Sequence, residues 1–120
     1  MNNFDFSEEF KRRTKCFALR IIKLYKTLPG SPEYQVIGKQ LVRSGTSVAA
    51  NYRAACRARS RAEFYSKMSI VVEEADESVF WLELLVEAGI IEERKMELIL
   101  SEAKEIVSIV SKARKTAKNR

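Results

Sequence analysis

Apolar residues recur along most of the chain at alternating intervals of four and three, the spacing that places them on one face of an α-helix. The clearest series is Phe64, Met68, Val71, Ala75, Ser78, Leu82 and Leu85. Similar series run from Phe10 to Leu28, from Ile37 to Ala55 and from Met96 to Ala113. Strands would require alternation with a period of two, and no such pattern competes with these four stretches.

The residues between these series predict where each helix begins and ends. Ser7, followed by two acids, is typical of a helix start, and Pro29-Gly30 ends that helix. Ser31-Pro32-Glu33 and the SRAE capping box at 60–63 begin the next two helices, and Gly89 closes the third. We therefore predict helices at about 8–28, 32–57, 61–88 and 92–115, followed by a basic tail at 116–120.

Short links join helices that are antiparallel neighbours. The expected fold class is therefore all-α, an antiparallel up-down-up-down four-helix bundle that forms a single domain over residues 1–120. In the second helix, small residues surround Gly45, which costs about 1 kcal/mol relative to alanine inside a helix. Close approach of a neighbouring helix would explain why this part of the helix surface is thin.

The third helix has a second apolar face. Phe80 and Leu84 lie nearly opposite the main series, with Trp81 and Ile70 beside them. A monomeric bundle buries only one side of each helix, and a large aromatic left in water loses roughly 1.5 to 3 kcal/mol of burial. We therefore predict that Ile70, Phe80, Trp81 and Leu84 form an interface with another copy of the chain.

Composition limits where the protein works. The apolar runs are all far shorter than the ~20 residues of a membrane span. Residues 1–10 contain three acids, where a secretory signal would be positive and then apolar. We expect a cytoplasmic protein with no membrane contact. In that compartment, Cys16 and Cys56 are most simply buried small hydrophobic residues rather than a disulfide or reactive thiols.

The sequence contains little that could support catalysis. It has no histidine, so a cysteine or serine nucleophile would lack its usual base, and its four glycines are too scattered for a phosphate-binding loop. The acids of the third helix could suggest a di-metal site, but that chemistry also uses histidine. We expect no enzyme activity, no cofactor and no metal. These acids fit better as a solvated rim or as partners for arginines of the second helix. Glu74 lies near the buried side, where it could join Ser47 and Asn51 in a structural polar contact.

Charge is segregated along the chain. Residues 1–61 contain 13 Lys/Arg against 4 Asp/Glu, residues 62–111 contain 4 against 12, and residues 112–120 contain 5 against none, so the three segments carry +9, −8 and +5. Arg12, Arg13 and Lys15 add to the basic pool. The candidate nucleic-acid-binding residues are Lys39, Arg43, Arg53, Arg57, Arg59, Arg61, Lys112, Arg114 and Lys115.

Two interpretations of this basic surface stay open. It could follow the phosphates of RNA or DNA without strong sequence preference, because few exposed aromatics accompany the arginines. Alternatively, it could only solvate the protein, whose task would then be that of a protein-interaction scaffold or adaptor.

The run RSGTSVAANYRAACRARSRAEFYSKMSIVVEEADESVFWLELL resembles the four-helix-bundle proteins encoded in intervening sequences of bacterial 23S ribosomal RNA genes. The resemblance spans nearly the whole chain. It is sharpest at Ser44, Ser47, Ala50, Asn51, Arg59, Ser60, Phe64, Glu74, Glu77, Trp81 and Leu82.

The resemblance implies a left-turning antiparallel bundle that assembles as a homopentamer with a central channel. A related bundle is the accessory protein of diversity-generating retroelements, where it binds nucleic acid and a reverse transcriptase. Family members commonly carry an acid shortly after the position of Asn51, where this chain has Arg53-Ala54-Ala55. The local surface is therefore expected to be more basic than usual.

Overall fold

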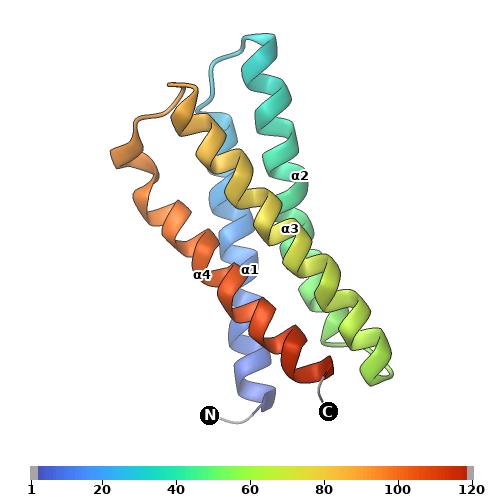
Figure 1. The fold of residues 1–120 in the computed structure, drawn as a ribbon. Coiled ribbons are helices and arrows are strands. Elements are labelled where there is room, and N and C mark those ends of the chain that lie inside the picture. The colour runs from blue at the N-terminus through green and yellow to red at the C-terminus, as the bar shows by residue number, and fades with distance from the viewer. Residues whose placement is uncertain (1–2, 119–120) are drawn as a thin grey trace.

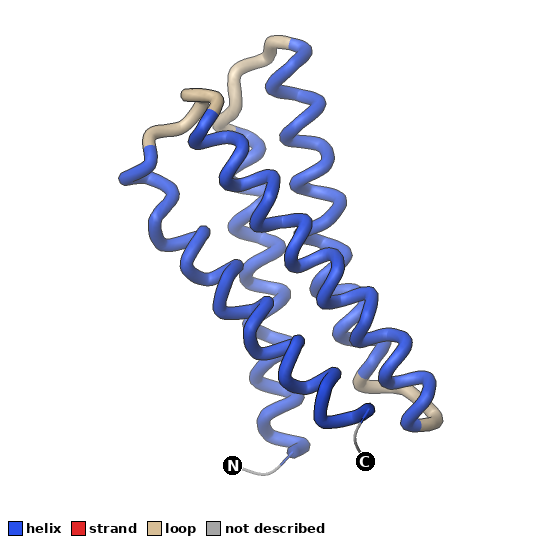
Figure 2. The backbone as a smooth tube through the Cα atoms, viewed as in Figure 1, coloured by secondary structure: helices blue, strands red, loops and turns tan. Residues whose placement is uncertain are grey.

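The computed structural model describes residues 3–118, which form four helices and no strand. They are α1 (Asn3–Lys26), α2 (Pro32–Ala55), α3 (Arg61–Glu87) and α4 (Glu93–Lys118). The helices run alternately up and down, joined by short links (Figures 1 and 2). The predicted fold class, an antiparallel up-down-up-down four-helix bundle, is confirmed. None of the helices within the described residues is long and apolar enough to cross a membrane.

The first helix begins earlier than the sequence predicts. α1 starts at Asn3 rather than near Glu8, so Ser7 lies inside the helix and does not cap it. Packing explains the extension, because the ring of Phe6 stacks on that of Phe10 at 5.8 Å, and Phe10 meets Tyr52 edge-on at 4.8 Å. These contacts hold the first turns of α1 against α2.

The last helix continues further than predicted. α4 runs to Lys118 instead of ending near Lys115, so most of the segment predicted as a basic tail is helical. Ala117 is buried, which gives the final turn a contact with the bundle. Residues 119–120 of the predicted tail lie outside the described residues.

The predicted signals at both ends of α3 act as expected. The hydroxyl of Ser60 accepts a hydrogen bond from the Glu63 amide at 3.0 Å, the contact of a capping box. At the other end, Gly89 has a φ of 74°, a conformation that glycine adopts without strain. The chain then folds back so that the Ile90 amide donates to the Leu85 carbonyl at 3.0 Å.

The core is built from one apolar stripe of each helix. Its largest fully buried side chains include Phe17, Ile21, Leu41, Met68, Leu82, Leu85, Met96 and Ile106. A polar contact between helices lies within it: the hydroxyls of Ser44 and Ser78 are 3.0 Å apart and join α2 to α3. Cys16, in contrast, is exposed, so its predicted burial is wrong. It lies on the side of α1 away from the core, and its neighbour Phe17 points inward.

Gly45 allows α1 and α2 to pack closely. A Cβ atom at this position would lie 3.0 Å from Cγ1 of Ile21, which is fully buried. Ile21 is β-branched and stiff, so it could move little to make room. The predicted close approach of a neighbouring helix is confirmed at this residue.

We predict that Gly45→Leu destabilises the bundle, because inserting methylene groups into a packed core costs about 1–3 kcal/mol. The melting temperature should fall by roughly 5 °C or more in a thermal scan. Ala50→Leu is the matched control, since Ala50 is exposed on the same helix and should change little. Equal melting temperatures for Gly45→Leu and the unmodified protein would contradict the close packing.

Candidate nucleic-acid interface at one end of the bundle

The up-down topology gathers basic residues from distant parts of the sequence at one end of the bundle. This end contains the start of α1, the end of α2, the α2–α3 link and the end of α4 (Figure 1). We call it the basic end. Seven of the predicted nucleic-acid-binding residues belong to it: Arg53, Arg57, Arg59, Arg61, Lys112, Arg114 and Lys115. The other two, Lys39 and Arg43, lie further along α2, with Lys39 roughly 21 Å from Arg53 along the helix.

A groove of about 560 Å³ runs between α1 and α2 at this end. Small side chains of α2 form part of its lining, and basic side chains of both helices stand beside them. The residues that line this basic groove are Glu8, Lys11, Arg12, Lys15, Thr46, Ala49, Ala50 and Arg53. The small residues of α2 therefore also leave a channel, bordered by Lys11, Arg12 and Lys15 of α1 and by Arg53 of α2.

Three cations of the basic groove have no carboxylate partner. Lys11 forms an ion pair with Glu8 of the same helix. Within the described part of the chain, no ion pair is found for Arg12, Lys15 or Arg53. Their charges are therefore available to an anion that enters the groove.

The sequence did not single out Lys11 as a site residue, and it placed Arg12 and Lys15 only in the general basic pool. The signal was present in the antiparallel pairing, which sets the start of α1 beside the end of α2. Arg13 of the same pool serves a different purpose. It donates to both Glu102 oxygens at 2.8 and 2.7 Å and pairs with Glu105 at 3.0 Å, and the Glu102 hydrogen bond raises the pKa of Arg13. Arg13 thereby ties α1 to α4.

Arg43 is also held within the protein. Its guanidinium donates to Glu74 at 2.8 Å and to Glu77, and the Trp81 indole donates to the same Glu77 oxygen at 2.9 Å. These contacts join α2 to α3. The acids of α3 thus serve here as partners for an arginine of α2, one of the interpretations that the sequence allowed.

The structure does not bring Glu74 together with Asn51. The Asn51 side-chain amide instead donates to the Ser47 carbonyl at 3.0 Å and to the Ser47 hydroxyl at 2.8 Å, both within α2. The predicted polar contact among Ser47, Asn51 and Glu74 therefore separates into two. Arg43, with its longer reach, takes the Glu74 carboxylate.

The predicted interface residues of α3 differ in exposure. Phe80 is 51% exposed and Ile70 is 38% exposed, whereas Leu84 is half-buried. Trp81 is half-buried against the core and meets Phe80 edge-on at 4.9 Å. Phe80 and Ile70 are thus two exposed apolar side chains on the outside of α3, about 15 Å apart along the helix, and Trp81 lies against Phe80.

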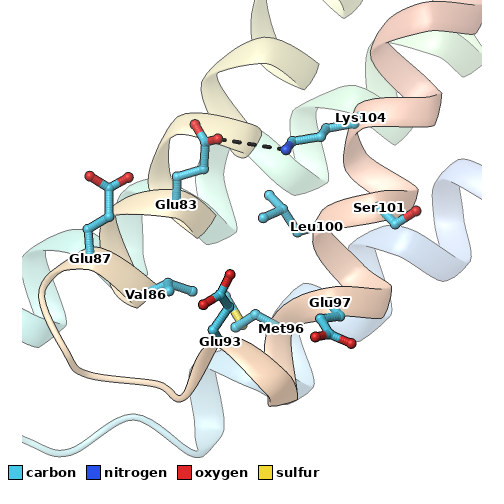
Figure 3. A pocket seen from close by; sticks show the side chains of 9 residues that line it. All are labelled: Glu83, Val86, Glu87, Glu93, Met96, Glu97, Leu100, Ser101 and Lys104. Atoms are coloured by element: carbon cyan, nitrogen blue, oxygen red, sulfur yellow. Dashed lines mark ion pairs between the residues drawn. The ribbon is translucent and has the colours of Figure 1, made fainter.

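An acidic pocket marks the opposite end of the bundle. A pocket of about 610 Å³ lies between the end of α3 and the start of α4 (Figure 3). It is lined by Glu83, Val86, Glu87, Glu93, Met96, Glu97, Leu100, Ser101 and Lys104. Lys104 lies 3.9 Å from the Glu83 carboxylate, so it offsets only part of this negative charge. The basic groove and the acidic pocket therefore lie toward opposite ends of a molecule that is 46 Å along its longest axis.

Comparison with known families shows to which family this chain is related. The profile of the 23S rRNA-intervening sequence protein family matches residues 8–112. The chain belongs to that family. The resemblance seen in the sequence is therefore confirmed at the family level.

A solved structure of a related protein supports the same assignment for the fold. It is the crystal structure of a protein with unknown function from the S23 ribosomal protein family of Bacteroides thetaiotaomicron VPI-5482. The two chains are 38% identical, and the similarity covers 91% of this chain and 97% of that one, with a TM-score of 0.83. No match is found among curated proteins.

In this family member, two weakly acidic side chains lie near the end of α2 at the basic end: Tyr52 is buried and Cys56 is half-buried. Burial raises the pKa of the Tyr52 hydroxyl, and the neighbouring Cys56 thiol raises it further. Burial likewise raises the pKa of Cys56, although Tyr52 and Lys11 act in the opposite direction. Both groups therefore stay neutral in the folded protein at a pH where they would ionise in the unfolded chain.

These shifts predict a loss of stability in alkali. A raised pKa in the folded state means that the folded protein holds its proton longer, so stability falls as pH rises above the unfolded values of about 8.5 for Cys and 10 for Tyr. Tyr52→Phe keeps the ring against Phe10 but has no proton to lose. In thermal scans from pH 8 to pH 11, its melting temperature should fall less than that of the unmodified protein. If the melting temperatures of the two proteins fall equally with pH, Tyr52 ionisation is not coupled to unfolding.

Proposed function

We propose that this protein is a cytoplasmic, non-enzymatic, homo-oligomeric bundle that binds the backbone of RNA or DNA without strong sequence preference. The observation that carries the proposal is the basic groove, in which Arg12, Lys15 and Arg53 form no ion pair with a carboxylate of residues 3–118. Phosphate groups carry the dominant charge of nucleic acids, and neutralising them releases counterions. A row of available cations along a channel suits that chemistry.

The lining of the groove favours phosphates over bases. It contains Lys, Arg, Thr and Ala side chains and one Glu, which pairs with Lys11, but no aromatic ring on which a base could stack. Contacts to phosphate and sugar position a protein on nucleic acid and carry no sequence information directly. The basic side chains of the α2–α3 link and of the end of α4 extend the same surface.

Assembly would strengthen a groove that is small in one subunit. Several copies of the groove bound to one strand act together, and linked sites can exceed the affinity of one site by about 10²–10⁴. The exposed Phe80 and Ile70 of α3 support a contact between copies. The family resemblance implies five subunits, and this number is part of the proposal.

A protein-interaction scaffold with no nucleic-acid role is the second candidate. The acidic pocket between α3 and α4 favours it, because apolar Val86, Met96 and Leu100 lie among four glutamates (Figure 3). Such a pocket repels phosphates and suits a basic, amphipathic segment of a protein. The scaffold becomes the better proposal if the purified protein binds no nucleic acid at low salt.

We predict that the protein binds fluorescein-labelled single-stranded RNA or DNA with a steep salt dependence. An assembly contacting six or more phosphates should lose ~10³-fold in affinity between 50 and 200 mM salt. The double variant Lys15→Glu, Arg53→Glu should weaken binding at least tenfold and flatten this salt dependence. Fluorescence anisotropy measures both quantities.

The matched control for this experiment is Arg94→Glu, Lys95→Glu, which makes the same charge change at the acidic end. Both residues are exposed at the start of α4. If the groove is the binding surface, the control should bind nearly as tightly as the unmodified protein. An equal loss in both variants would mean that net charge, and not the groove, governs binding.

We further predict that Phe80→Glu disrupts the assembly. A carboxylate in place of an aromatic at a subunit contact loses apolar burial and leaves a charge without a partner. Light scattering should report the mass of a single chain, 13.8 kDa, for the variant and a multiple of it for the unmodified protein. Leu98→Glu is the control, because Leu98 is 80% exposed on α4 and should not alter the subunit count. An unchanged count for Phe80→Glu would remove α3 from the interface.

A further inference from the structure

We infer that the exposed face of α3 is covered by the outer face of α1 from a second copy, so that the copies join head to tail. This inference rests on the assembly within the proposed function and adds the identity of the two contacting faces. The α3 face consists of Ile70, Glu73, Phe80, Leu84 and Glu87. The α1 face consists of Cys16, Leu19, Lys23 and Lys26.

The α3 face is a helical stripe of its own. Its residues follow steps of three and four once Glu77, which is turned toward Arg43, is included in the series. Glu73, Phe80 and Glu87 are exposed, and Leu84 is half-buried. An apolar centre thus has a free carboxylate on either side of it along the helix.

The α1 face has the same helical spacing and the opposite charge. Its members occur at steps of three, four and three, and all are exposed, including Leu19 at 56%. The stretch from Lys11 to Pro32 contains no Asp or Glu at all. Leu19 is therefore an exposed apolar side chain bordered by cations.

Charge complementarity selects this pairing over pairings of like faces. Two α3 faces placed together would oppose their glutamates, and two α1 faces would oppose their lysines, and both arrangements cost energy through like-charge repulsion. In the mixed pairing, Lys23 and Lys26 lie near Glu87 at one end of an apolar centre formed by Leu19 with Phe80 and Leu84, and Glu73 lies beyond the other end. Ridges at steps of three and four on both helices allow such side chains to interdigitate.

The register of this contact follows from the spacing within each face. Lys26 lies seven residues after Leu19, and Glu87 lies seven residues after Phe80. When the two helices run in the same direction, Leu19 can therefore meet Phe80 while Lys26 meets Glu87. Since α1 and α3 point the same way within the bundle, copies standing side by side with parallel axes satisfy this condition (Figure 1).

The two faces point to opposite sides of the bundle. α1 packs against α2 and α4, and α3 also packs against α2 and α4, whereas α1 and α3 do not pack against each other. They occupy diagonal corners, so their outer faces look away from one another. A contact between two different faces is heterologous, and repetition of it produces a ring or a filament.

The contact leaves most of the basic groove accessible. Lys11, Lys15 and Arg53 of the groove lie outside the α1 face, whereas Arg12, four residues before Cys16, comes opposite Glu73 of the second copy. One helix can therefore serve both purposes.

Mixing two variants tests the pairing. Leu19→Glu breaks the α1 face and keeps the α3 face, and Phe80→Glu does the reverse. Both positions are exposed, so both chains should fold, which circular dichroism checks. Each variant alone should sediment as a single chain. A mixture of the two variants should contain 1:1 dimers, because one intact face remains on each partner. A chain that carries both substitutions has no intact face, so it should not associate with either single variant.

Exchanging the charges at positions 26 and 87 provides a second test of the pairing. Lys26→Glu should lower the apparent mass of the assembly at a fixed protein concentration, and adding Glu87→Lys in the same chain should restore it, since each contact then regains an opposite-charge pair. Failure of Glu87→Lys to restore assembly would overturn the proposed register and pairing.

The outcomes separate this inference from the proposed function. If Leu19→Glu keeps the full subunit count while Phe80→Glu loses it, the partner of α3 is another face, and the head-to-tail pairing is wrong although the assembly stands. If the unmodified protein is a single chain, the assembly and this inference both fail. Salt-dependent binding through the groove is measured independently and can survive either result.

Discussion

The shared burial of one apolar stripe from each of four helices is the constraint on which every other surface of this protein depends. Once Ile21, Leu41, Leu82 and Ile106 are in the same core, the faces that remain outside are fixed, because side chains on a helix have fixed angular relations. The short links then make neighbours antiparallel. Residues that are scattered through the sequence are thereby brought together as a basic groove near one end and an acidic pocket near the other.

The periodic features of the sequence predicted the fold well because they are local. The series from Phe64 to Leu85 and the SRAE capping box depend on residues within a few turns of each other, and the structure follows both. The prediction of where α1 starts failed for the opposite reason. Its extension to Asn3 depends on Phe10 packing against Tyr52, more than forty residues away, and a local capping signal at Ser7 contains no information about that contact.

The candidate site was predictable only in part. The charge segregation located most of its residues, but the groove depends on the alignment of α1 with α2, which determines that Lys15 stands beside Arg53. Nor can composition distinguish cations that are available from cations that hold the bundle together. Arg13 and Arg43 look like their neighbours in the sequence, yet each is bound to two glutamates of another helix.

The separation of charge along a 46 Å molecule has a consequence for orientation. If the groove binds a nucleic-acid strand as proposed, the strand attracts the basic groove and repels the acidic pocket, so the molecule turns its basic end toward the strand before contact. The acidic pocket then faces outward, away from the bound strand. A strand coated in this way would present the carboxylates of the acidic pocket to its surroundings, where a basic partner could reach them.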